Sequence, residues 1–118
     1  MNPLILAFVG DAYYNLFIKH ELAKKGEQKI NDLHKQASKL VCAKNQSKLF
    51  DVILPLLDEA EKEIANRARN TKQNTYPKNC TLAEYKLATA FEAVIGYHYL
   101  MGKHDRLNEL LKAVFDGK

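Results

Sequence analysis

The chain has 118 residues, which is enough for one domain with a hydrophobic core but not for two of ordinary size. Its 47% hydrophobic and 27% charged residues exclude a disordered or fibrous protein, and 18 basic against 14 acidic side chains give a net charge of +4 that suits a polyanionic partner. The two cysteines, Cys42 and Cys80, form no disulfide or zinc pattern, and the apolar stretches are too short to span a membrane, so a soluble protein of the reducing cytoplasm is expected.

Apolar residues recur at helical spacing through the first half of the chain. Residues 3–25 are apolar on almost every side, which predicts a central helix buried among others. A second helix is expected to be capped by Asn31 or Asp32 and to reach about residue 41. A third should follow over residues 43–54, where Pro55 ends the pattern.

The second half of the chain continues this helical pattern. A short charged helix should run from Asp58 to Asn70 and lead into a surface loop over residues 70–80. Thr81 and Glu84 form a capping box that opens a long helix over residues 82–102. A last amphipathic helix, capped by Asp105, should precede Gly117. We therefore predict an all-α, single-domain bundle of about five to seven helices.

Two acidic side chains, Asp11 and Glu92, interrupt the two most apolar of these helices, and neither has a basic partner one helical turn away. A buried carboxylate without a partner is costly, so it must be protonated, paired across helices or bound to a cation. A tertiary ion pair or hydrogen bond would explain one such acid. Two acids in this setting favour a Mg²⁺ site instead. Small residues flank both acids: Ala7, Gly10, Ala88, Thr89 and Gly96.

Several short motifs resemble those of a known family. Residues 9–12 (VGDA) resemble the signature of ribonuclease III, and residues 90–96 (AFEAVIG) resemble its second acidic motif. The resemblance is closer to Mini-III, the minimal branch of that family, and extends in order through the segments at 31–35, 41–46, 67–70 and 77–79.

This resemblance implies a homodimeric, Mg²⁺-dependent endonuclease in which Mn²⁺ can substitute. It also implies cleavage of double-stranded RNA to give 5′-phosphate products, and maturation of the large-subunit (23S) ribosomal RNA precursor. Residues 1–118 would form one catalytic domain without a separate double-stranded RNA-binding domain, and Asp11 and Glu92 would be the catalytic metal ligands. Ribonuclease III proper has two further acids, at the positions of Ala7 and Thr89, so the number of metal ions stays open.

Basic and amide side chains cluster between the fourth predicted helix and the long one. We predict that they contact RNA phosphates, since A-form RNA exposes its backbone far more than its base edges. An ordinary solvated helix end, with cations near its negative pole, is the alternative. The cluster comprises Arg67, Arg69, Asn70, Lys72, Gln73, Asn74, Lys78 and Asn79. A second candidate, for which a plain solvated face is an equal alternative, comprises Lys35, Lys39, Lys44 and Gln46.

The histidines and aromatic residues carry no catalytic pattern. His20, His34, His98 and His104 lack zinc-ligand spacing and are expected at the surface or in hydrogen bonds, with the role of His34 open. The aromatic cluster of the first helix is expected in the core, with part of it available for a dimer interface; its members are Phe8, Tyr13, Tyr14 and Phe17.

Two other functional classes are compatible with a basic helical chain. One is a non-catalytic ribonuclease III-like RNA-binding module, which retention of Asp11 and Glu92 disfavours. The other is a DNA-binding regulator that uses the second and third helices as a helix-turn-helix, although the linker lacks the usual glycine turn.

Overall fold

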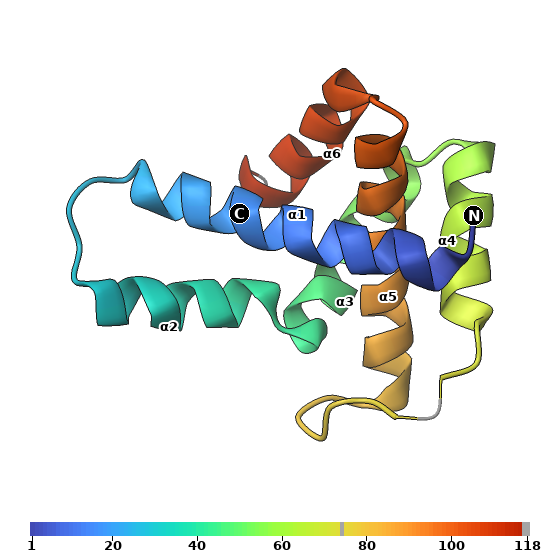
Figure 1. Ribbon diagram of the computed structural model, residues 1–118, viewed down its shortest axis with the longest axis horizontal. Helices are drawn as coiled ribbons and strands as arrows, with labels where there is room; N and C mark the ends of the chain where they lie inside the picture. Colours follow the sequence, from blue (N-terminus) through green and yellow to red (C-terminus); the bar gives the residue numbers. More distant parts are fainter. Residues whose placement is uncertain (74, 117–118) are drawn as a thin grey trace.

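The computed structural model describes residues 1–73 and 75–116, and over them the chain is helical with no strand. This confirms the predicted all-α bundle. The predicted stop at Gly117 and the amide of Asn74 lie outside the described residues. The elements are α1 (Pro3–Ala23), α2 (Ile30–Val41), α3 (Ala43–Ile53), the 3₁₀ turn η1 (Leu54–Leu56), α4 (Glu59–Asn70), α5 (Leu82–Leu100) and α6 (His104–Asp116) (Figure 1).

Local capping explains where α5 and α4 begin. The Glu84 amide donates to Thr81 Oγ1 at 3.0 Å and the Thr81 amide donates to Glu84 Oε1 at 2.8 Å, so the predicted capping box is confirmed. Asp58 and Glu61 form the same reciprocal pair at the start of α4. Each box satisfies two backbone amides that a helix start would otherwise leave without acceptors.

Two predicted helix starts are wrong. α2 begins at Ile30 with Lys29 before it, and no side chain caps it, so Asn31 and Asp32 lie inside its first turn. α6 begins at His104, which places Asp105 in the first turn rather than at the cap. In both places several polar residues follow one another, and an acid stabilises a helix start nearly as well from the first turn as from the cap.

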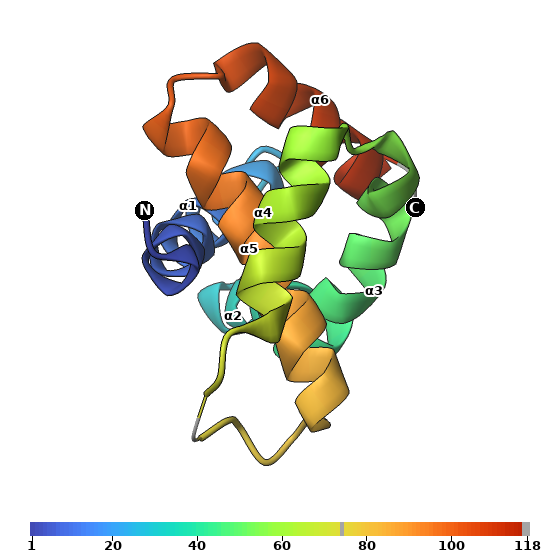
Figure 2. The same ribbon diagram turned by 90° about the vertical axis from the view of Figure 1, so that its right-hand side faces the viewer.

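The long helix α5 is the centre of the bundle. α1 crosses it, while α3 and α4 pack along it on other sides (Figure 2). The second half of α1 runs antiparallel to α2, and the two helices extend together away from the bundle (Figure 1). Among the described residues, no helix combines the length and apolarity needed to cross a bilayer.

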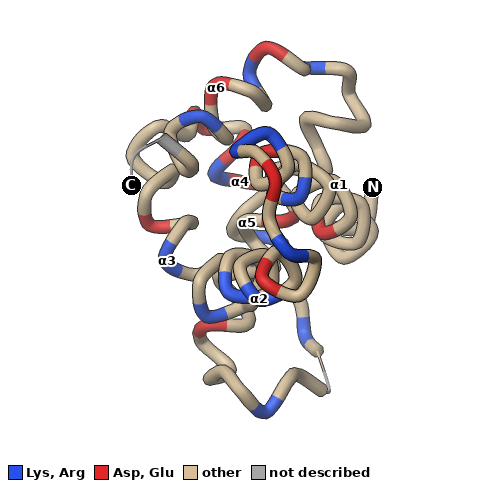
Figure 3. Tube along the Cα trace, turned by 90° about the vertical axis from the view of Figure 1, so that its left-hand side faces the viewer, with Lys and Arg blue, Asp and Glu red and all other residues tan. Residues whose placement is uncertain are grey.

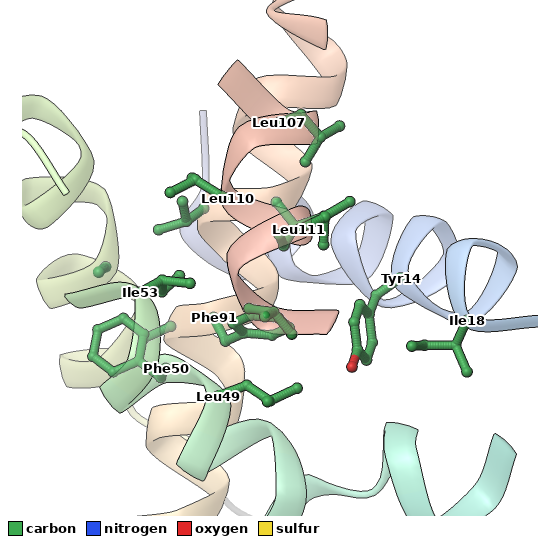
Figure 4. Close-up of a cluster of buried hydrophobic side chains, with 14 of the residues drawn as sticks. Tyr14, Ile18, Leu49, Phe50, Ile53, Phe91, Leu107, Leu110 and Leu111 are labelled. Atoms are coloured by element: carbon green, nitrogen blue, oxygen red, sulfur yellow. The ribbon is translucent and has the colours of Figure 1, made fainter. Parts of the chain in front are cut away.

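The core lies between α1, α3, α5 and α6 (Figure 4). Tyr14 and Phe91 meet edge to face at its centre, with ring centroids 5.1 Å apart, and the Tyr14 hydroxyl donates to the Leu40 carbonyl at 3.4 Å. Tyr14 therefore lies in the core, as predicted. Phe8 does not: it is 79% exposed, because none of the described helices covers the face of α1 that carries it.

Candidate active site

Two glycines allow α1 and α5 to cross in backbone contact. A Cβ atom on Gly10 would overlap the carbonyl of Glu92 and lie 2.9 Å from the amide nitrogen of Gly96. A Cβ atom on Gly96 would overlap the carbonyl of Leu6 in the same way. Only glycine permits so close an approach. Because Asp11 follows Gly10 directly, this crossing brings Asp11 and Glu92 to one place.

Asp11 and Glu92 line the same cavity, which has a volume of about 360 Å³. Helices α1, α3 and α5, the last residue of α2 and the segment after α4 form its walls. The small side chains among the lining residues leave room beside the carboxylates. The full lining is Leu4, Ala7, Phe8, Asp11, Val41, Ala43, Gln46, Gln73, Tyr85, Ala88, Thr89 and Glu92.

The two carboxylates differ in their surroundings. Glu92 is half-buried, and burial together with the neighbouring Asp11 carboxylate raises its pKa to about 9. Asp11 is exposed, so the expectation that both acids are buried is wrong for Asp11. Its Oδ1 accepts a hydrogen bond from Asn15 Nδ2 at 3.1 Å, a partner one helical turn away. A bound cation would favour the ionised form of both carboxylates and so would oppose the raised pKa of Glu92.

The oxygen atoms around this cavity suit a hard divalent cation. Two carboxylates are enough for Mg²⁺, which keeps several of its waters when it binds to proteins. Thr89 contributes little, since its hydroxyl donates to the Tyr85 carbonyl at 2.9 Å and accepts from Gln73 at 3.4 Å. Within the described ranges, no cluster of three or more Asp, Glu, His or Cys side chains is placed to hold a metal ion.

Two residues that line this cavity were not predicted from the sequence. Gln46 was expected on the surface with Lys35 and Lys44, yet it is 1% exposed and faces the site. Its spacing from Leu49, Phe50 and Ile53 on the buried face of α3 was the available signal. Tyr85 lies two helical turns before Glu92 and so shares its face of α5.

The basic side chains predicted to contact RNA are exposed. Arg67 and Arg69 lie in the last turn of α4, and Lys72 and Lys78 follow in the segment that leads to α5. Figure 3 shows basic positions on α2, which carries Lys35 and Lys39, and on the loop below it. In the part of the chain that the structure describes, none of the six forms an ion pair; they are Arg67, Arg69, Lys72, Lys78, Lys35 and Lys39.

A buried polar cluster on the far side of α5 was also missed. Glu61, 2% exposed, lies 2.6 Å from His98 Nε2 and accepts two hydrogen bonds from Arg106 at 2.8 and 2.9 Å. Arg106 also donates to the Leu56 carbonyl at 2.6 Å. The cluster ties α4, α5 and α6 together outside the acidic cavity. The spacing of Asp58 and Glu61 is that of a capping box, and this signal could have placed Glu61 in the first turn of α4.

All four histidines have the surroundings that were predicted for them. His98 is buried and hydrogen-bonded to Glu61, while His20, His34 and His104 are exposed. None of the four lines the cavity that contains Asp11 and Glu92.

Known proteins match this chain over nearly all of its length. Residues 4–103 match the family described as Ribonuclease III domain. The chain is 44% identical over 114 residues to a Brevibacillus brevis protein named Mini-ribonuclease 3, an alignment that covers 97% of this chain and 85% of the relative. It is 45% identical over 112 residues to a Thermoanaerobacter protein of the same name, covering 95% of this chain and 79% of the relative.

A solved structure also matches. The crystal structure of a protein from Fusobacterium nucleatum superposes with a TM-score of 0.90 at 40% sequence identity. The match covers 99% of this chain and 93% of the other.

Proposed function

Because this chain belongs to the ribonuclease III family and is an endoribonuclease, we propose that it cleaves double-stranded RNA with Mg²⁺ bound by Asp11 and Glu92. The family acts on double-stranded RNA and generally depends on a divalent metal. The observation that carries the proposal is the glycine crossing of α1 and α5, which brings the two carboxylates into one cavity. Relatives that are named as ribonucleases favour the enzyme over both the non-catalytic module and the DNA-binding regulator.

The proposed reaction is the attack of water on a phosphodiester, which leaves a 5′-phosphate and a 3′-hydroxyl. When bound, Mg²⁺ supplies an activated water and stabilises charge on the phosphate oxygens; Mn²⁺ can take its place. Asp11, which is exposed, and Glu92, which is half-buried, would hold the cation through their ionised carboxylates. The small side chains of Ala7 and Ala88 keep the cavity open beside the carboxylates.

RNA binding is proposed to come from this helical domain itself. Arg67, Arg69, Lys72 and Lys78 are exposed cations without an acidic partner in the described part of the chain, so phosphates can pair with them. Gln73 connects this segment to the catalytic cavity by its hydrogen bond to Thr89. The contact set is proposed to include Asn70, Asn79, Lys35 and Lys44 as well.

We also propose that the protein acts as a homodimer through the exposed face of α1. Ile5, Phe8 and Leu16 are 51%, 79% and 65% exposed and follow one another at helical spacing. A row of large apolar side chains in water is unfavourable, and a second copy of the same helix would cover it symmetrically. Phe8 also borders the cavity, so the interface and the active site would be continuous.

The proposed natural substrate is the precursor of large-subunit (23S) ribosomal RNA, as the resemblance of the motifs implies. Duplexes copied from the paired ends of that precursor should be cut at defined positions, whereas a duplex of unrelated sequence should give scattered products. Equal, scattered cleavage of both duplexes would contradict the substrate assignment and leave the nuclease assignment intact.

The experiment that tests the enzyme is cleavage of a long duplex RNA with Mg²⁺, with EDTA, and by the Asp11→Asn and Glu92→Gln variants. Cleavage should need the metal and fall by at least about 100-fold in each variant, as expected when a group that acts on the transition state is lost. Asp51→Asn is the matched control, because Asp51 is an exposed acid on α3 away from the cavity. Wild-type rates in Asp11→Asn would overturn the assignment.

A further inference from the structure

Asn15 is a half-buried polar residue in the middle of the apolar helix α1. Asparagine is unfavourable inside a helix, because its amide competes with the backbone for hydrogen bonds. The amide of Asn15 is committed instead to the residue one helical turn before it. Its Nδ2 donates to the backbone carbonyl oxygen of Asp11 at 2.8 Å and to the side-chain Oδ1 of Asp11 at 3.1 Å.

The contact with the Asp11 carbonyl fixes which way the amide of Asn15 faces. A backbone carbonyl only accepts hydrogen bonds, so the nitrogen of Asn15 faces Asp11 and its oxygen points away. The amide nitrogen carries two hydrogens, one for each of these two acceptors. Asn15 therefore ties the carboxylate of Asp11 to the backbone of the same residue.

Of the two carboxylates in the cavity, Asp11 is the one that needs such a restraint. Glu92 is half-buried in α5, whereas Asp11 is exposed. An exposed aspartate side chain can occupy several rotamers, and it loses that freedom when a ligand requires one of them. Among the described residues no basic side chain pairs with Asp11, which leaves the Asn15 amide to orient it.

We propose that Asn15 is a positioning residue of the metal site: by holding Asp11 Oδ1, it keeps the carboxylate turned so that its second oxygen is presented to the cation shared with Glu92. This inference rests on the proposed function. Asn15 does not line the cavity, so it acts through Asp11 and is not a further ligand. A ligand that is oriented before the metal arrives loses less freedom on binding, and its hydrogen-bond partner thereby raises the affinity of the site.

The test measures Mn²⁺ binding by electron paramagnetic resonance on the full chain without RNA. Asn15→Ala removes the amide and should weaken Mn²⁺ affinity about tenfold, the usual loss for an outer partner of a metal site. Asn15→Gln keeps a donor amide and should bind Mn²⁺ more tightly than Asn15→Ala. The matched control is Asn66→Ala, which removes an exposed asparagine of α4 outside the cavity and should leave the affinity unchanged.

The melting temperature separates this role from a purely structural one. Alanine favours a helix over asparagine, so Asn15→Ala should melt no lower than the wild type although it binds Mn²⁺ more weakly. A hydrogen bond that only stabilised α1 would give the opposite pattern, with a lower melting temperature and an unchanged Mn²⁺ affinity. That pattern would overturn the inference.

A measurement without metal tests the orientation of Asp11 directly. Three-bond NMR couplings from the Asp11 backbone to its carboxyl carbon should have the values of a single rotamer in the wild type and averaged values in Asn15→Ala. Averaged values in the wild type, or wild-type Mn²⁺ affinity in Asn15→Ala, would overturn the inference and leave the metal site itself intact. A wild-type protein that bound no Mn²⁺ would overturn the metal dependence in the proposed function, and the inference with it.

Discussion

The crossing of α1 and α5 predicts a large effect for Gly10→Ala, a change of one methyl group. The added Cβ would lie 2.6 Å from the carbonyl carbon of Glu92 and 2.9 Å from the amide nitrogen of Gly96. Both atoms belong to backbone in the middle of a helix, so neither can move aside as a flexible side chain would. Alanine favours a helix over glycine by about 1 kcal/mol, which acts in the opposite direction. Overpacking costs about 1–3 kcal/mol, and more where the neighbours cannot yield.

We expect the overlap to dominate in Gly10→Ala, with a net loss of about 2 kcal/mol or more. The melting temperature should then fall by about 8 °C or more, at about 4 °C per kcal/mol for a domain of this size. The helices can relieve the overlap only by separating, which moves Asp11 from Glu92. A displacement of about 1 Å at reacting groups can cost about 100-fold in rate.

Calorimetry and duplex RNA cleavage test this prediction together. The control is Asn66→Ala on the exposed face of α4, where no overlap arises and stability should stay within about 0.5 kcal/mol of the wild type. A Gly10→Ala protein more stable than the wild type, with unchanged cleavage, would mean that helix propensity decides and that the crossing is not tight.

Three further predictions concern other parts of the molecule. Burial opposes ionisation of Glu61, but Arg106 and the other hydrogen bonds lower its pKa to about 2. The ionised side chain therefore stabilises the folded protein by about 3 kcal/mol at pH values above the unfolded pKa of about 4.3, and this stability is lost as the pH falls towards 2. Glu61→Gln should flatten this acid dependence of the unfolding free energy, measured by urea denaturation. Leu16→Glu should convert the proposed dimer to a monomer in sedimentation equilibrium, and a wild-type monomer would refute the interface. Replacing Arg67 and Arg69 by Ala should weaken RNA binding and reduce its logarithmic salt slope by about 1 to 2, measured by filter binding between low and moderate salt.

Local signals in the sequence predicted the helices better than they predicted burial. The capping box of Thr81 and Glu84 needs only residues within one turn, and it is found where expected. The prediction of a capping residue for α2 was wrong because neighbouring polar residues compete for the same position. α1 is apolar on almost every side, which predicts burial all round. Periodicity does not distinguish a face that meets the core from one left for another chain. The exposure of Asp11 was therefore not predicted, and which member of the aromatic cluster would be exposed, here Phe8, was left open.

The site was predictable as a pair of acids but not as a geometry. Asp11 and Glu92 are conspicuous in apolar helices, yet their meeting depends on Gly10 and Gly96, which are 86 positions apart in the chain. Each glycine alone indicates only a small residue in a helix. Together they set the separation of two backbones, and so of the carboxylates, before any side-chain rotamer is chosen. This dependence explains why Gly10→Ala should affect stability and cleavage together, whereas Asp11→Asn should affect cleavage alone.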